Sequence, residues 1–172
     1  MNAETLLRLL LSVAVLAACV SDEGEEPPAA PDPIGSELLG FTTIFGLPSC
    51  AEGHLYRHRD AVQLQCFASD GSFSWENHGS LHAQGQTQLE AALAEAAPDD
   101  TTPGDGLGCK SSELGAATFT LWVGEQPVDY PAGCPHQGIE DLDAVVEILL
   151  DDIADCVELD MLESVEDGCR AY

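Results

Sequence analysis

Between residues 54 and 77, apolar and polar side chains alternate along the chain. The apolar positions of the clearest run are Val62, Leu64, Cys66 and Ala68, separated by Gln63, Gln65 and Phe67. A period of two is typical of a half-buried β-strand, so this segment is predicted to form an antiparallel meander. A turn at Arg59-Asp60 would place Leu55 of the preceding strand on the same apolar face.

The pair Asp70-Gly71 predicts how this run continues. Asp-Gly favours a two-residue hairpin turn, because both central positions of that turn need positive φ. A turn centred there opposes Ala68 to Phe73. It also opposes Cys66 to Trp75, so the apolar pattern and the turn chemistry predict the same register.

A second hairpin is predicted near the middle of the chain. Residues 117–123 alternate in the same way, and the alternation resumes at residues 128–132 after a break that contains Gly and Pro. The expected turn is centred on Glu125-Gln126, which leaves Trp122 on the polar side of its strand. The opposed pairs would be Val123 with Val128 and Leu121 with Tyr130.

Two segments have helical periodicity. The first is predicted to begin at Thr87, because Thr87-Gln88-Leu89-Glu90 fits a capping box, and to end before Pro98. The second has a strong apolar stripe, typical of an amphipathic helix. The positions of that stripe are Leu142, Val145, Val146, Leu149, Ile153, Cys156 and Val157.

This order of elements predicts an α+β fold, an antiparallel sheet with two helices packed on one face. Residues 37–172 are expected to form one domain, although residues 37–49 have no assignable pattern because Gly40, Gly46 and Pro48 interrupt them. The element order resembles that of emfourin-type inhibitors of thermolysin-like metalloproteases. That resemblance implies a protease-inhibitor-like module as an alternative function, with no shared motif to identify an inhibitory residue.

The N-terminus predicts export. Residues 9–18 form a short apolar segment after Arg8, and Leu16-Ala17-Ala18-Cys19 resembles the lipobox of bacterial lipoprotein precursors. The resemblance implies removal of residues 1–18 as a signal peptide and a lipid anchor on Cys19. Val20, in place of Asp, implies the outer membrane of the cell envelope. The acidic, Pro-rich residues through 36 are expected to form a disordered tether.

The cysteine count agrees with this interpretation. Once Cys19 is assigned to lipid, six of the seven cysteines remain, and six in an exported domain indicate three disulfides. Six cysteines allow 15 connectivities, and local pairing is our hypothesis. The hypothetical pairs are Cys50–Cys66, Cys109–Cys134 and Cys156–Cys169. A zinc site is the alternative, although the chain contains no Cys-x-x-Cys.

The formal net charge of −26 limits the classes of molecule that the chain is expected to bind. Phosphate binding needs clustered cations, so the composition argues against nucleic acid. Twelve acids and no Lys or Arg lie between residues 139 and 168, and we expect them to face solvent on the polar side of the second helix. Such a surface favours a cationic protein or ligand, and the alternative is that the acids only keep the domain soluble in a salty medium.

Candidate chemistry is sparse. His78 and His82 lie in a loop-like stretch that could fold around a metal, and they are the weak candidates for a metal site. His54 and His58 are predicted to lie on a strand, where four residues span about 13 Å and cannot share an ion. We predict no catalytic residue and no cofactor. The sequence therefore favours a lipid-anchored binding or structural domain, with a His-centred metal-binding or enzyme domain as a further alternative.

Overall fold

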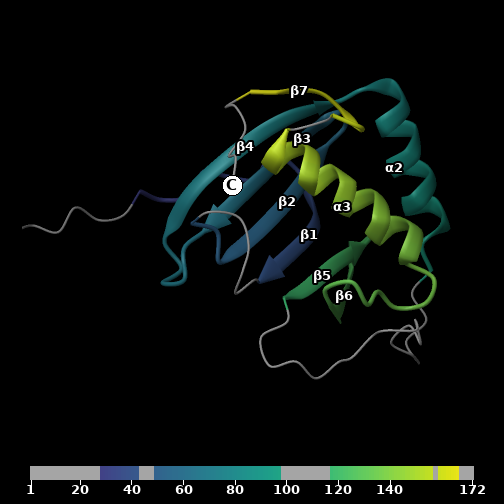
Figure 1. Cartoon of the computed structure of the whole chain (residues 1–172), viewed down its shortest axis with the longest axis horizontal. Coiled ribbons are helices and arrows are strands. Elements are labelled where there is room, and N and C mark those ends of the chain that lie inside the picture. Colours follow the sequence, from purple (N-terminus) through teal and green to yellow (C-terminus); the bar gives the residue numbers. More distant parts are fainter. Residues whose placement is uncertain (1–27, 43–48, 98–116, 157–158, 167–172) are drawn as a thin grey trace, which may run out of the picture.

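The computed structural model describes residues 28–42, 49–97, 117–156 and 159–166. It confirms the predicted fold class, because a seven-stranded antiparallel sheet carries two helices (Figure 1). The strands are β1 Ser36–Thr42, β2 Glu52–His58, β3 Ala61–Phe67, β4 Phe73–Leu81, β5 Thr118–Val123, β6 Gln126–Pro131 and β7 Leu162–Val165. The predicted signal peptide and Cys19 lie outside the described residues.

The strand order is β6-β5-β1-β2-β3-β4-β7. Strand β1, which has no recognisable sequence pattern, therefore lies between the two predicted hairpins and joins them into one sheet. Leu39 of β1 pairs with Leu55 on one side and with Leu121 on the other, and all three are buried. Among the described residues, no helix has the length and apolar character needed to cross a membrane.

The meander forms largely as predicted. Residues 59 and 60 connect β2 to β3, and Arg59 has a φ of 58°. Leu55 pairs with Leu64, and Cys66 pairs with Trp75. These four side chains are buried on the face that the helices cover.

The turn between β3 and β4 differs from the prediction. Gly71 N donates to Ala68 O, and Ala68 N donates to Ser72 O, so Ala68 faces Ser72 and not Phe73. Only Gly71 of the expected pair has positive φ, at 81°. The register then shifts after Phe67 pairs with Phe73, and this irregularity restores the predicted Cys66–Trp75 pair.

The second hairpin is paired two residues away from the predicted register. Gly124, with a φ of 66°, and Glu125 form the turn, so Leu121 pairs with Val128 and Phe119 with Tyr130. The prediction centred on Glu125-Gln126 was wrong because it did not use the freedom of Gly124 to adopt positive φ. A shift of two residues keeps every side chain on its predicted face.

Helix α2 spans Ala83–Glu95 and begins four residues before the predicted Thr87. Its N-cap is His82, whose Nδ1 accepts a hydrogen bond from Gly85 N at 2.9 Å. The Thr87 hydroxyl instead donates to Ala83 O within the helix. The capping-box prediction was therefore wrong. The helix begins one turn earlier, where the His82 imidazole accepts the N–H group of Gly85, so Thr87 lies inside the helix.

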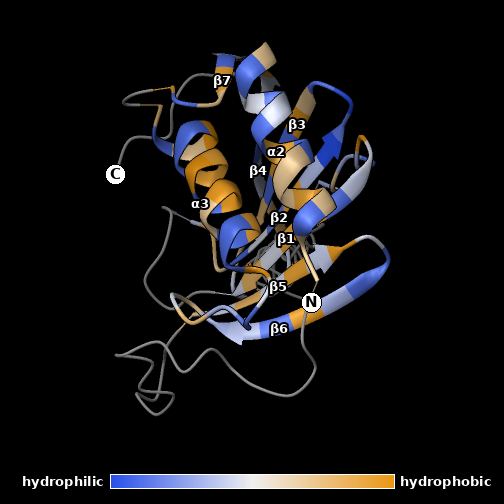
Figure 2. Ribbon diagram, turned by 90° about the vertical axis from the view of Figure 1, so that its right-hand side faces the viewer, coloured by the Kyte–Doolittle hydropathy of each residue, from blue (hydrophilic) through white to orange (hydrophobic). Residues whose placement is uncertain are grey.

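Helix α3 spans Glu140–Asp155 and lies on the same side of the sheet as α2 (Figure 2). Most of its predicted apolar stripe packs on the core, since Leu142, Val146, Leu149 and Ile153 are buried. Cys156 instead follows the helix as its C-cap, with a φ of 48°, and Val157 lies outside the described residues. The fully buried core residues from both helices and the sheet include Leu39, Leu55, Leu64, Leu89, Leu121, Leu142, Leu149 and Ile153. This core holds the strands in place. The hollows described below lie on the other face of the sheet and at the ends of its strands.

The predicted Cys50–Cys66 disulfide is present and joins the segment before β2 to β3. Both of its cysteines are buried. Cys134 and Cys156 are also disulfide-bonded. Their hypothetical partners, Cys109 and Cys169, lie outside the described residues, so those two pairings stay predictions.

Candidate functional site

The face of the sheet opposite the helices is polar, and the chain before β1 lies along part of it. Ile34 N donates to Gln63 Oε1 at 3.0 Å, and Gln65 Nε2 donates to Pro31 O at 2.8 Å. Both glutamines are buried as a result. The last part of the expected tether, residues 28–35, therefore contacts the sheet, and β1 begins at Ser36.

Three side chains on this outer face form a carboxylate clamp, which consists of Glu37, His54 and Glu52. His54 Nδ1 lies 2.7 Å from Glu37 Oε1, and His54 Nε2 lies 2.8 Å from Glu52 Oε1. A bulge in β1 between Glu37 and Leu39 turns Glu37 towards the ring. The absence of a side chain at Gly40 leaves space for the Glu37 carboxylate, because a Cβ at Gly40 would lie 3.0 Å from Glu37 Oε1.

The clamp favours the charged imidazolium. The hydrogen bond that His54 donates to Glu37 is the largest cause of the raised pKa of His54, partial burial opposes the rise, and Glu52 adds to it. Burial, with the charges of Glu37 and Glu52, also raises the pKa of the neighbouring Tyr56. His54 therefore stays charged over a wider pH range than a free histidine, with each of its two ring N–H groups donating to one carboxylate.

Two hollows meet beside this clamp and share Glu37 and Trp122. The smaller hollow has a volume of about 220 Å³ and lies on the outer face, where its other polar side chains are Thr42, Glu52, His54, Thr118 and Thr120. The larger hollow has a volume of about 610 Å³, within the usual size range of small-ligand sites. Trp122, which the sequence placed on the polar side, is only partly buried.

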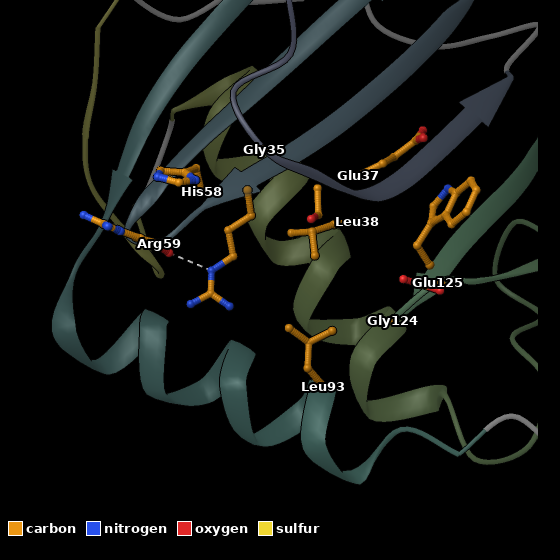
Figure 3. A pocket seen from close by; sticks show the side chains of 11 residues that line it. Gly35, Glu37, Leu38, His58, Arg59, Leu93, Gly124 and Glu125 are labelled. Carbon is orange, nitrogen blue, oxygen red and sulfur yellow. Dashed lines mark hydrogen bonds between the residues drawn. The ribbon is translucent and has the colours of Figure 1, made fainter.

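The larger hollow has chemically different ends (Figure 3). His58 and Arg59, from the end of β2 and its turn, lie at one end, and Glu37 and Glu125 lie towards the other. Leu38 of β1 and Leu93 of α2 lie between them. The hollow therefore lies where the sheet, helix α2 and the β5–β6 turn meet.

Arg57 contributes the principal cation of the larger hollow. Its Nη2 lies 2.9 Å from Glu90 Oε1 of α2, and its Nε donates to Arg59 O at 2.7 Å, the bond drawn as a dashed line in Figure 3. Only 14% of the Arg57 side chain is exposed. These two bonds hold the guanidinium in the space between the sheet and α2.

The predicted histidine pair does not form a site. His78 lies within β4 and not in a loop, and its Nε2 is 3.4 Å from Glu76. His82 follows the strand, caps α2 and lies 2.8 Å from Asp160 O through Nε2. The described residues contain no group of three or more His, Cys, Asp or Glu side chains arranged to hold a metal ion.

The acidic segment of α3 is not entirely on the surface. Asp152 is 2% exposed and accepts backbone N–H groups of Asp160, Met161 and Leu162 at 3.1, 2.7 and 2.9 Å. Asp143 is also buried and accepts a hydrogen bond from the Tyr130 hydroxyl. The expectation that all these acids face solvent was wrong, because buried donors recruit two of them.

Two further large aromatic side chains, which could have formed a binding face, belong to the core. Trp75 and Tyr130 are 7% and 2% exposed, so neither presents a binding face. Burial and the bond to Asp143 raise the pKa of Tyr130 far above its usual value. Of Trp75, Trp122 and Tyr130, only Trp122 lines the two hollows.

Comparison with known proteins supplies no relative, since no protein-family model, curated protein or solved structure matches the chain. The site therefore rests on its own geometry. Sequence reasoning missed Glu37 and Arg57 as site residues, and it considered His54 only as a metal ligand and rejected it in that role. One signal was available, because two of the chain's five Lys and Arg residues are Arg57 and Arg59.

Proposed function

We propose that the chain is a non-enzymatic lipoprotein, anchored in the bacterial cell envelope through Cys19, whose domain binds a cationic partner group at the junction of the two hollows. The lipobox-like Leu16-Ala17-Ala18-Cys19 supports the anchor, and the Pro-rich residues that follow it suit a tether between anchor and domain. The six remaining cysteines, of which four are disulfide-bonded among the described residues, are consistent with export.

The binding proposal depends on one observation: acidic side chains and a tryptophan line the two hollows close to where they meet. Trp122 and Glu37 line both hollows, Glu125 lines the larger one and Glu52 the smaller one. An indole face and carboxylates together attract an ammonium or guanidinium group, through cation–π and charge interactions. A cationic protein segment or ligand is therefore the partner that this junction fits best.

The net charge of −26 reinforces this choice. Long-range attraction raises the association rate of a cationic partner at low salt, and the same field opposes nucleic acid. The charge alone would not locate a site, because acids are spread over the surface. We therefore propose the hollows as the place where the cationic group binds, because carboxylates and an indole line them.

Binding can be tested with a lysine-containing peptide and the purified domain. We expect Trp122→Ala and Glu125→Gln each to weaken binding by roughly tenfold, as loss of about 1.4 kcal/mol would. Glu163→Gln on β7 is the matched control, because it removes the same charge from an exposed position outside the hollows. Equal weakening by Glu125→Gln and Glu163→Gln, with no effect of Trp122→Ala, would mean that only the overall charge attracts the peptide.

The anchor needs a separate test in bacteria. Cys19→Ser should block lipid attachment and leave the precursor uncleaved by the lipoprotein signal peptidase. Fractionation and mass measurement of the mature N-terminus would detect both effects. Normal maturation and membrane retention of this variant would refute the anchor without affecting the binding site.

A further inference from the structure

The cations of the described domain are concentrated at one end of the larger hollow. Arg57 and Arg59 are the only Lys or Arg side chains among the described residues, and both line this hollow together with His58. The opposite end carries Glu37 and Glu125 (Figure 3). In a chain with 31 acids, the larger hollow thus has two arginines at one end and carboxylates towards the other.

Arg57 retains donors that a ligand can use. A guanidinium has five N–H donors, and the bonds to Glu90 and to Arg59 O use two of them. Within the described part of the chain the remaining donors of Arg57 have no partner. The side chain is nevertheless mostly buried, so its position is held before a ligand arrives and little conformational entropy remains to be lost.

The middle of the hollow is apolar. Leu38 and Leu93 lie between the charged ends, and Trp122 adds an aromatic surface. A free amino acid is poorly matched, because its ammonium and carboxylate are attached to one carbon and cannot reach opposite ends. A ligand with its two charges separated by an apolar body fits both ends at once.

We propose that the larger hollow binds a short peptide with free termini, with its carboxylate on Arg57, its ammonium group between Glu37 and Glu125, and an apolar side chain against Leu38, Leu93 and Trp122. This proposal rests on the proposed function and names the ligand class for the same site. Such a peptide has no net charge, so the strongly negative domain does not repel it as it would repel a simple anion.

The test uses the tripeptide Ala-Leu-Ala in four forms, with each terminus either free or blocked. Calorimetric titration of the full mature domain should show the tightest binding for the form with two free termini. Amidation of the carboxylate and acetylation of the amine should each weaken binding by roughly tenfold, typical of losing one charge-assisted hydrogen bond. A peptide with both ends blocked should bind most weakly.

Two variants assign the carboxylate to Arg57. Arg57→Gln should abolish the difference between the free and amidated C-terminus while leaving the preference for a free amine. Glu90→Gln should have the opposite effect, because it releases Arg57 from its ion pair and makes the guanidinium a stronger partner for the peptide. Thermal melting of each variant checks that the domain is folded.

The outcomes separate the two proposals. If acetylation weakens binding and amidation has no effect, the peptide-carboxylate inference is wrong and the cationic function stands. Unchanged end preference in Arg57→Gln, together with no gain in Glu90→Gln, would also overturn the inference. If none of the four forms binds and the lysine-containing peptide also fails, the proposed function itself is wrong.

Discussion

Two regions of this acidic domain use carboxylates in opposite ways. In the carboxylate clamp on the outer face, Glu37 and Glu52 flank His54, and each accepts a hydrogen bond from one ring nitrogen. On helix α3, Asp143, Glu147, Asp151 and Asp155 repeat every four residues and form what we call the α3 acid row. No Lys or Arg occurs between residues 139 and 168 to neutralise this row.

The pKa values reflect this difference. Burial raises the pKa of all four carboxyls in the α3 acid row, and mutual repulsion adds to the rise at Glu147 and Asp151. In the clamp the same type of charge instead raises the pKa of a histidine and so stabilises its cationic form. Asp143 is the one member of the row with a donor described for it, because the Tyr130 hydroxyl donates to it and partly offsets the rise of its pKa. A carboxylate therefore orders this structure where a donor or cation meets it, and destabilises it where acidic neighbours repel it.

Asp152 shows the ordering role at its strongest and gives the prediction with the largest effect. Asp152→Asn replaces one carboxylate oxygen with an N–H donor that faces backbone N–H groups at the start of β7. We expect the free energy of unfolding to fall by about 3 kcal/mol, from the lost charged acceptor and the unsatisfied buried donors. Urea denaturation at neutral pH would measure it.

Glu163→Gln on β7 is the control for that experiment, because it removes one negative charge from an exposed position close to Asp152 in sequence. It should change stability by less than about 0.5 kcal/mol. If the two variants lose the same stability, Asp152 acts only through the net charge. The distinction between ordered and repelling carboxylates on α3 would then fail.

Most of the sheet could be predicted, because β3 and β5 alternate cleanly between the core and the outer face. The register error at β5–β6 was harmless for burial, since a shift of two residues preserves the face. Strand β1 was missed for a physical reason. Leu38, Leu39, Gly40 and Phe41 are all buried, so the strand shows no alternation.

The candidate site was less predictable than the fold. Its clamp depends on the bulge between Glu37 and Leu39, which no sequence period reveals, and on residues brought together from β1 and β2. The start of α2 was missed because His82 caps it, whereas Ser, Thr, Asp and Asn are the common N-caps. In both cases a polar side chain has a role that depends on local backbone geometry, which the sequence pattern does not show.

The clamp gives the second prediction, which depends on pH. The pKa of His54 is raised on folding, so the clamp contributes stability fully below the unfolded value of about 6.5 and loses it as pH rises through the folded pKa. His54→Gln should therefore cost about 1 kcal/mol at pH 5.5 and much less at pH 9. Chemical denaturation of both proteins at the two pH values would measure the difference.

His78→Gln is the matched control, because His78 also lies on the outer face but forms an ion pair with a single carboxylate among the described residues, Glu76 at 3.4 Å. It should show a smaller dependence on pH than His54→Gln. An equal cost of His54→Gln at both pH values would contradict the clamp. The contribution of His54 would then be packing against Tyr56 and Phe67, not charge.

The α3 acid row gives the smallest effect and the opposite sign. Glu147 has acidic neighbours one helical turn away on each side, and like charges at this spacing cost a few tenths of a kcal/mol per pair. Glu147→Gln should therefore raise the free energy of unfolding by about 0.5 kcal/mol at pH 7. Because the pKa of Glu147 is raised on folding, the wild-type carboxyl is protonated at low pH, and the gain should vanish as pH falls below the unfolded value. Added salt should reduce the gain at pH 7, since it screens the same repulsion. A stability loss at pH 7, or a gain that persists at pH 3, would mean that Glu147 has a partner that offsets its repulsion, and the contrast between the two carboxylate regions would no longer hold.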